Sequence, residues 1–452
     1  MQPGTLGDDL EDPRLSRMYA SMVARNFGGL WERFGIWLAI NATKLLWMGV
    51  LGLVILLPLG WAAHTRGRFS LLKSHIRERI SPPEAQPPRP GGQDVLMLQR
   101  ALLEGGGMPE FVSATLLPGR GMNTLQITAY LPGKGEVPLL SAPSIAQAAV
   151  SMDGGGMDAN GGASLRMGGA IEAPWAGRMY GTPSPEGSRI LTQWRGRSLT
   201  LPVTTREPGR AASSDGGMLL AVPADSVSSS VMPDGGEAQA VFQPGTFGDR
   251  WPSQTEVSIT ILMSSHVLDL RVTAKNVGTE AEPFGLGWQP RFAIPSGDRS
   301  QVTLRMPGGV RMETRAEAGG VPTGRLLPVE GSSYDFTGRG GAKLGPGSLD
   351  EGFVHLRPAI LDFGPAAEMR DPKSNYRLRI TAMTPAIREM RVTSPAGSNY
   401  VVVAPQLNID DPLGKEWPAG EDTGMVVLQP GQSVQWKVRL ELFTTTTEGP
   451  SL

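Results

Sequence analysis

The stretch Leu268-Asp269-Leu270-Arg271-Val272-Thr273-Ala274 alternates strictly between apolar and polar side chains. Because successive side chains on a β-strand point to opposite faces, this alternation predicts a strand with one face on a core and the other in solvent. Two further segments repeat the pattern, Leu125 to Leu131 and Val434 to Leu442. Half-buried strands of this kind are typical of antiparallel sheets. The sequence therefore predicts a mainly β protein, built as a large antiparallel sandwich of two sheets.

The composition of the 452-residue chain supports this fold class and argues against several function classes. Gly (59) and Pro (39) are abundant and charged residues make up only 19%, which suits many short strands joined by turns. A net charge of -1 gives no electrostatic reason to expect a nucleic-acid partner. The chain has no Cys, which excludes disulfides and thiolate nucleophiles, and its four His show no metal-ligand spacing. We therefore predict neither a metal site nor a cofactor.

An apolar segment near the N-terminus predicts a membrane anchor. Leu45 to Ala63 is a run of 19 residues without a charge, and as a helix it would span about 28 Å of a lipid bilayer. We assign residues 35–64 to a single transmembrane helix. A helix buried in a soluble core and a cleaved signal peptide are the alternatives, and a signal peptide would begin unusually late.

The segment before the anchor, residues 1–34, is predicted to form an amphipathic helix that lies at the membrane interface or against a partner subunit. Asp12-Pro13 resembles the start of a helix. Apolar residues recur on one face from Leu15 to Val23, and Gly28-Gly29 interrupts this pattern.

The remaining boundaries follow from composition. Residues 65–93 form a basic juxtamembrane segment and a Pro-rich linker, residues 94–443 the β domain, and residues 444–452 a flexible tail. Basic residues flank both sides of the anchor, so the positive-inside rule favours a cytoplasmic β domain only slightly. A late anchor before a large β domain is commoner in an exported arrangement. We predict a single-pass protein of a bacterial inner membrane with a periplasmic β domain.

A set of short motifs between Met122 and Phe443 resembles, in the same order, those of the aldose 1-epimerase (galactose mutarotase-like) family. The central one is Trp288-Gln289-Pro290-Arg291-Phe292, which follows a strand ending in Asn276-Val277-Gly278 and resembles the family's G-x-H-P-x-F. The others are Ala173-Pro174-Trp175-Ala176-Gly177-Arg178, Val321-Pro322-Thr323-Gly324, Tyr334-Asp335-Phe336, Leu349-Asp350-Glu351-Gly352-Phe353, Val403-Ala404-Pro405-Gln406 and Leu428-Gln429-Pro430-Gly431. The resemblance implies an antiparallel β-supersandwich, the fold of that family.

In that family a Glu removes a proton from the anomeric hydroxyl while a His protonates the ring oxygen, and the sugar opens and recloses. The resemblance places the acid at Gln289 and the base at Ala404, and neither side chain can exchange a proton near neutral pH. The family's other active-site His, usually in an H-G turn, has no match between Arg195 and Arg206. The resemblance therefore implies a member that lacks both catalytic groups.

The resemblance also implies ligand-binding residues. Counterparts of Arg178 and Asp350 contact sugar hydroxyls, with Gln289 beside them and Trp288 or Trp175 as a stacking face. In the alternative, Arg178 forms a structural salt bridge and the tryptophans fill the core of the sandwich.

Other residues are candidates for a relocated acid or base. Asp350, Asp410 and Asp411 offer carboxylates, although an Asp-Asp-Pro turn more often caps a loop. His355 alternates with Val354 on a strand, which favours a surface or packing role over a displaced acid. His266 is assigned no role.

Three functions are compatible with these observations. The first is a membrane-anchored, catalytically degenerate mutarotase-like protein that serves as a binding or scaffolding subunit of a larger membrane complex, with partner subunits and a possible sugar ligand. The second is an active aldose 1-epimerase, an isomerase, with relocated acid and base. The third is a membrane-tethered carbohydrate-binding module.

Overall fold

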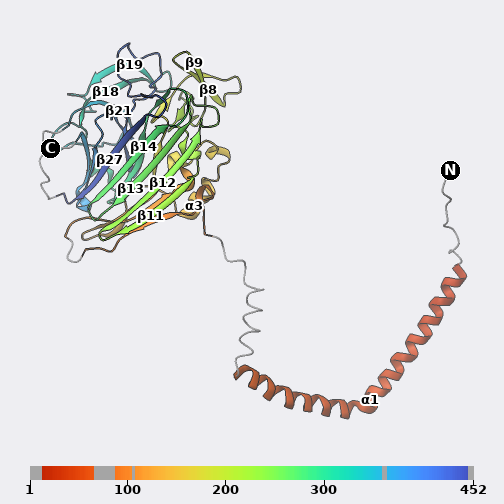
Figure 1. Cartoon of the computed structure of the whole chain (residues 1–452). Helices are drawn as coiled ribbons and strands as arrows, with labels where there is room; N and C mark the ends of the chain where they lie inside the picture. The colour runs from red at the N-terminus through yellow and green to blue at the C-terminus, as the bar shows by residue number, and fades with distance from the viewer. Residues whose placement is uncertain (1–12, 66–86, 104–106, 359–363, 446–452) are drawn as a thin grey trace, which may run out of the picture. The chain divides into compact units, whose positions relative to one another are not determined.

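A computed structural model of the protein describes residues 13–65, 87–103, 107–358 and 364–445. The chain divides into two compact units, Met1–Gln86 and Pro87–Leu452. The first unit is described as one long helix, and the second contains the described strands (Figure 1).

The helix of the first unit, α1, spans Pro13–Thr65 without a break. Its stretch Arg33–Leu59 is long and apolar enough to cross a membrane, and none of it is buried inside the protein. The chain thus has a helix of the length and composition that a single-pass anchor requires.

The helix α1 runs through Gly28 and Gly29, which interrupt the apolar pattern of the sequence. A glycine in a helix interior costs only about 1 kcal/mol relative to alanine, and the helix-forming residues on either side outweigh that cost. The predicted cap Asp12, the side chains of residues 13–32, most of the linker and the end of the tail lie outside the described residues.

An eleven-stranded antiparallel sheet forms one layer of the second unit. Its strands lie in the order β1-β2-β3-β5-β16-β25-β24-β21-β18-β19, and β4 pairs with β3. Their bounds are β1 Leu96–Gln99, β2 Glu110–Leu117, β3 Asn123–Leu131, β4 Gly135–Pro138, β5 Gly169–Glu172, β16 Gly287–Ala293, β18 Gly308–Arg315, β19 Val321–Pro328, β21 Leu349–Leu356, β24 Glu389–Ser394 and β25 Tyr400–Gln406.

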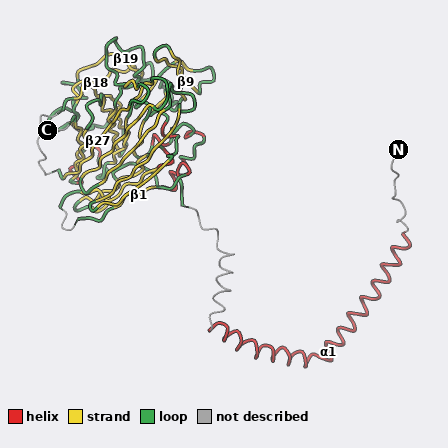
Figure 2. Tube along the Cα trace, in the orientation of Figure 1, coloured by secondary structure: helices red, strands yellow, loops and turns green. Residues whose placement is uncertain are grey.

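A nine-stranded antiparallel sheet forms the second layer, in the order β11-β12-β13-β14-β27-β23-β22-β17-β20. Its bounds are β11 Ser226–Met232, β12 Gly235–Gly245, β13 Thr255–Met263, β14 Val267–Asn276, β17 Thr303–Arg305, β20 Ala342–Lys343, β22 Ala366–Asp371, β23 Tyr376–Ala382 and β27 Ser433–Phe443. Figure 2 shows the long strands of this unit running side by side.

Short elements complete the second unit. The small sheets contain β6 Arg178–Met179 with β10 Ser214–Asp215, β7 Thr182–Pro183 with β8 Arg189–Trp194 and β9 Arg197–Pro202, and β15 Glu282–Phe284 with β26 Val426–Leu428. The helix α3 spans Ile145–Ser151, and 3-10 turns lie at η1 Pro90–Gly92, η2 Pro118–Arg120, η3 Gly156–Asp158, η4 Ser164–Arg166, η5 Leu219–Ala221, η6 Arg299–Gln301 and η7 Pro372–Ser374.

One large apolar cluster joins inward-facing residues of both sheets, among them Ile127, Leu270 and Val438. The three segments with alternating side chains lie within β3, β14 and β27, so the predicted strands and the predicted two-sheet sandwich are confirmed. Each strand contributes alternate side chains to the core, which leaves the other face of each sheet free for polar groups.

Candidate functional site

Strand β16 divides its side chains between the core and the opposite face of the eleven-stranded sheet. Trp288, Pro290 and Phe292 are buried, and the rings of Trp288 and Phe292 pack edge to face with centres 5.9 Å apart. Gln289 and Arg291 alternate with them and are partly exposed. The two-residue period of the strand therefore turns the polar residues of this motif away from the core.

Strand register brings the two expected catalytic positions together on that face. The pairing of β16 with β25 places Gln289 beside Ala404. Ala404 pairs in turn with Arg391 of β24. Because directly paired residues in a sheet point to the same side, Gln289, Ala404 and Arg391 share one face.

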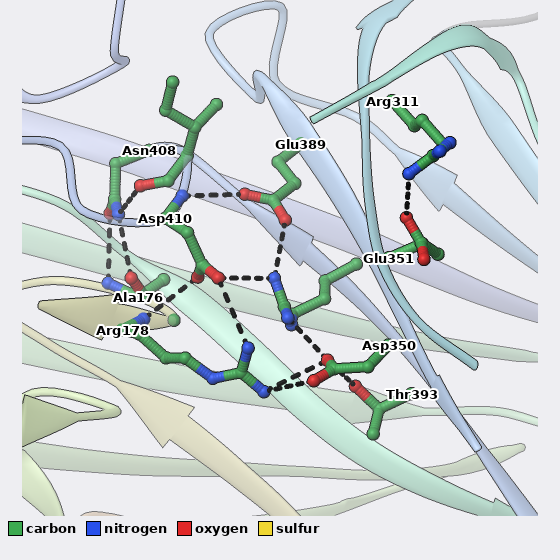
Figure 3. A network of polar contacts seen from close by, with 12 residues as sticks. Ala176, Arg178, Arg311, Asp350, Glu351, Glu389, Thr393, Asn408 and Asp410 are labelled. Atoms are coloured by element: carbon green, nitrogen blue, oxygen red, sulfur yellow. Dashed lines mark hydrogen bonds and ion pairs between the residues drawn. The ribbon is translucent and has the colours of Figure 1, made fainter. Parts of the chain in front are cut away.

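Figure 3 shows a network of polar contacts that contains Arg178, Asp350, Glu389 and Asp410. Arg391 is buried and joins this network through ion pairs. Its guanidinium contacts the carboxylates of Asp350 and Asp410 and lies 3.6 Å from that of Glu389. The Nη2 atom of Arg178 donates to both oxygens of Asp350, at 2.8 and 3.0 Å, and its Nη1 lies 3.7 Å from Asp410. Two arginines and two aspartates therefore alternate around a closed ring of opposite charges.

The surroundings fix the charge on the acidic groups. Burial alone would raise the pKa of Asp350, but Arg391 and Arg178 outweigh it and hold that pKa well below its ordinary value. Burial and the nearby Asp410 raise the pKa of Glu389 well above its ordinary value. Asp350 is therefore held as a paired carboxylate, whereas the surroundings of Glu389 favour its neutral form.

Two glycines give the network its space. Gly177 has a φ of +66°, and a Cβ at this position would lie 2.3 Å from Oδ1 of Asp410. Gly352 pairs with Arg391 across the sheet, and a Cβ there would lie 2.3 Å from Oε1 of Glu389. A side chain at either position would displace a carboxylate of the network.

A cleft of about 300 Å³ opens beside the network. Its lining includes Arg178, Gln289 and Asp350, so the structure brings these three expected ligand residues together. The cleft also contains two buried side-chain oxygens that lack a hydrogen-bond partner, Oε1 of Gln289 and Oδ1 of Asp215. Buried polar atoms are almost always hydrogen-bonded, so these two oxygens are suited to donors from a bound molecule. Among the described residues, no three His, Asp or Glu side chains are grouped to hold a metal ion.

Comparisons with known proteins agree with this geometry. The family model for aldose 1-epimerase matches residues 224–441. Over these residues the chain is similar to that family.

Solved structures share the fold at low sequence identity. The chain resembles a galactose mutarotase-like protein from Clostridium acetobutylicum with a TM-score of 0.61 and 14% identity, over 78% of this chain and 99% of that one. For a putative aldose 1-epimerase from Escherichia coli K12 the TM-score is 0.55 and the identity 16%, over 78% and 100%. For the GalM/aldose epimerase homologue from C. elegans the TM-score is 0.56 and the identity 14%, over 77% of this chain and 98% of that one. A comparison with curated protein sequences gives no match.

The stacking face expected from the aldose 1-epimerase family is wrong for both tryptophans, because each lies in a core. Trp288 is 1% exposed, and its Nε1 donates to the carbonyl of Gly169 at 3.1 Å. Trp175 is 0% exposed, donates to the carbonyl of Ser214 and stacks on Trp251 with ring centres 5.4 Å apart. Neither ring has a face open to the cleft.

The candidates for a relocated acid or base lie outside the cleft lining, except Asp350. Asp410 is buried inside the ion-pair network. Asp411 accepts a hydrogen bond from the backbone N–H of Tyr180 at 2.9 Å, and burial together with Glu416 raises its pKa to about 8. The side chain of His355 is exposed and lines a different cavity. These positions are typical of turn capping and surface roles.

Three cleft and network residues were not predicted from the sequence as site residues: Arg291, Arg391 and Asp215. Arg291 follows Gln289 by two residues, so strand alternation is a signal that could have found it. Arg391 and Asp215 carry no such local signal, because long-range strand pairing determines where they lie.

Glu172 of β5 is expected to make stability depend on pH. Burial raises its pKa from 4.5 to about 8, although the N–H of Gly177 donates to it at 3.3 Å. The folded protein thus binds this proton more tightly than the unfolded chain, and its contribution to stability falls as pH rises from about 4.5 to about 8. We expect Glu172→Gln to flatten the pH dependence in this window, measured by urea unfolding of the full-length protein. Glu136→Gln, at an exposed position on β4, is the control, and equal slopes for both variants would contradict the assignment.

Proposed function

We propose that this protein is a membrane-anchored, catalytically degenerate mutarotase-like protein whose cleft binds a sugar without epimerising it. It acts as a binding or scaffolding subunit of a larger membrane complex. The site chemistry, the binding geometry and the N-terminal helix each support one part of the proposal.

The main support is the position of Arg391. At the two places where the family transfers protons, this chain has Gln289 and Ala404, and the guanidinium of Arg391 shares their face. Asp350 is the carboxylate of the cleft that could best replace the missing base. Its arginine partners lower its pKa, however, which makes it a weak base near neutral pH. A hexose in the cleft would thus meet groups that hold hydroxyls and no efficient pair for proton transfer.

The cleft retains what binding requires. Arg178 and Asp350 are fixed by each other, so their positions are set before a ligand arrives. The free oxygens of Gln289 and Asp215 accept hydrogen bonds, and sugar hydroxyls donate them. Preorganised charged groups beside free acceptors favour recognition of a polyhydroxylated ring.

The helix Arg33–Leu59 supports the membrane part of the proposal. With a single anchor in a bacterial inner membrane and the β domain in the periplasm, the cleft would face sugars outside the cytoplasm. Residues 1–34, which precede the anchor, would bind the partner subunits.

Polarimetry tests the loss of catalysis. Full-length protein in a polyoxyethylene detergent, which contributes no sugar, is expected to leave the mutarotation of freshly dissolved α-glucose and α-galactose at the buffer rate. The reason is that the loss of one proton-transfer group typically costs about 10²–10⁴-fold, and both family positions lack one. Acceleration that Asp215→Asn or Asp411→Asn abolishes would instead identify an active epimerase with a relocated base.

Purification in a mild detergent tests the complex. The protein is expected to elute with other membrane subunits at a size well above that of its monomer. Elution as a monomer at every detergent concentration, with no other protein attached, would contradict the subunit role and leave the carbohydrate-binding module as the better description.

A further inference from the structure

The two ends of the cleft differ in how their charges are balanced. At one end, the carboxylate of Asp350 contacts three guanidinium groups, those of Arg178, Arg210 and Arg391. At the other end lie Arg166 of η4 and Arg291 of β16. The strand pairing places Arg291 three strands away from Asp350 in one row of paired residues. No carboxylate forms an ion pair with either of these two arginines anywhere in the described part of the chain. The second end therefore has positive charge without a partner.

Arg291 is held in place by neutral groups only. Its Nη2 donates to the carbonyl of Leu165 at 3.3 Å, and its Nη1 lies 3.5 Å from the hydroxyl of Tyr400. The guanidinium also lies over the Tyr400 ring, 5.4 Å from the ring centre, and its Nε has no acceptor. The side chain is thus oriented, and its buried Nε has no hydrogen-bond partner.

The electrostatic surroundings of Arg291 remain uncompensated. Burial lowers its pKa, the neighbouring Tyr400 opposes that effect in part, and Arg166 adds to it. Glu172 is the acidic side chain that acts on it, and burial raises the pKa of Glu172 to about 8, so this group is largely neutral near pH 7. A mostly buried guanidinium without an anion is unusual in proteins, because desolvating a charge is costly unless a partner compensates.

An anionic group on a ligand would supply the missing partner. The planar fork of a guanidinium matches carboxylate and phosphate oxygens, and such charge-assisted hydrogen bonds are stronger than neutral ones. The carboxylates of the cleft could repel an anion bound at Arg291, but each is paired or lies near another arginine. Asp350 is neutralised by its arginines, and Glu207 lies 3.4 Å from Nε of Arg210. Asp215 lies in β10, opposite Arg178 in the paired strand β6. The anion is therefore favoured at Arg291.

We propose that the cleft binds an acidic sugar, with a carboxylate or phosphate on Arg291 and Arg166 and ring hydroxyls on Gln289 and Asp215. This inference rests on the proposed sugar-binding function and narrows it to an anionic ligand. The cleft volume of about 300 Å³ suits a single sugar ring with its anionic substituent.

Calorimetric titration of the full-length protein in a polyoxyethylene detergent tests the proposal with three probes: glucose, glucuronate and glucose 6-phosphate. At about 20 mM NaCl, at least one anionic probe is expected to bind about tenfold or more tightly than glucose, as a charged hydrogen bond allows. The preference is expected to shrink at about 200 mM NaCl, because salt screens the attraction. The anion that binds more tightly distinguishes a carboxylate ligand from a phosphate ligand.

Substitutions test whether Arg291 causes the preference for an anionic probe over glucose. Arg291→Gln is expected to remove the preference for the anion, so that glucuronate and glucose 6-phosphate bind no more tightly than glucose. Arg166 is the second arginine of the proposed anion site and is partly exposed. Arg166→Gln is expected to weaken the preference for the anion, and this variant replaces Arg291→Gln in the test if Arg291→Gln does not fold. Arg325→Gln is the matched control, because Arg325 is 71% exposed and lies outside the cleft lining.

The outcomes separate this inference from the function on which it rests. Glucose binding as tightly as both anions, or a preference that survives in Arg291→Gln, would overturn the acidic-ligand proposal and leave sugar binding intact. Failure of all three probes to bind at millimolar concentration would overturn the sugar-binding function itself.

Discussion

Replacing Arg391 with methionine is expected to lower the free energy of unfolding by about 3–5 kcal/mol. The change removes the shared partner of Asp350 and Asp410 and leaves the fully buried carboxylate of Asp410 without its nearest guanidinium. Breaking a buried ion pair costs this much because the remaining charge stays in surroundings of low dielectric. Urea unfolding of the full-length protein in detergent, followed by near-UV circular dichroism, measures the change.

An exposed arginine provides the control for this substitution. Arg325 is 71% exposed and lies 3.6 Å from Glu313, so Arg325→Met is expected to change stability by less than about 1 kcal/mol. Adding Asp410→Asn to Arg391→Met is expected to recover part of the loss, since it removes the buried carboxylate whose remaining guanidinium partner, that of Arg178, lies 3.7 Å away. If Arg391→Met were as stable as Arg325→Met, the ring of charges would contribute little to the fold.

The sheets could be predicted because their signal is local. The alternation in Leu268 to Ala274 directly encodes which face of β14 meets the core, and tertiary packing reinforces it. The same rule, applied to β16, separates Trp288 from Gln289 and would have placed the tryptophan in the core. The resemblance suggested a stacking role for Trp288, but strand phase decides where a side chain can point.

The candidate site could be predicted only in part. Gln289, Arg178 and Asp350 stand in family motifs, so their joint presence in one cleft followed from the resemblance. Arg391 stands in no such motif, and its role depends on the register of β24 against β25. A shift of one residue in that register would turn its side chain to the core, and nothing local in the sequence fixes the register.

Arg391 changes the interpretation of Ala404. From the sequence, Ala404 is a base position that has lost its carboxylate. In the structure, Ala404 is 0% exposed and pairs with an arginine that is already bound to two aspartates. The position therefore has no free volume and lies beside an arginine that already has carboxylate partners. Restoring the missing acid and base tests whether these surroundings prevent catalysis.

Installing Gln289→His and Ala404→Glu together is expected to leave the mutarotation of α-glucose at the buffer rate. Such groups contribute about 10²–10⁴-fold each when they are free to exchange protons. Here the new carboxylate would meet Arg391, which would lower its pKa and make it a weak base near neutral pH. The added atoms must also fit a packed position, which is expected to cost about 1–3 kcal/mol of stability.

The matched control is Gln289→His with Ala404→Gln, which adds nearly the same volume without the charge. Polarimetry at about pH 7 compares the two double variants with the unmodified protein, and urea unfolding confirms that both are folded. A rate about 10²-fold or more above the control in the Glu-containing variant would show that Arg391 leaves a carboxylate free to act as a base. Equal rates in the two variants would show that the ring of charges around Arg391, together with the missing acid and base, separates this cleft from an epimerase.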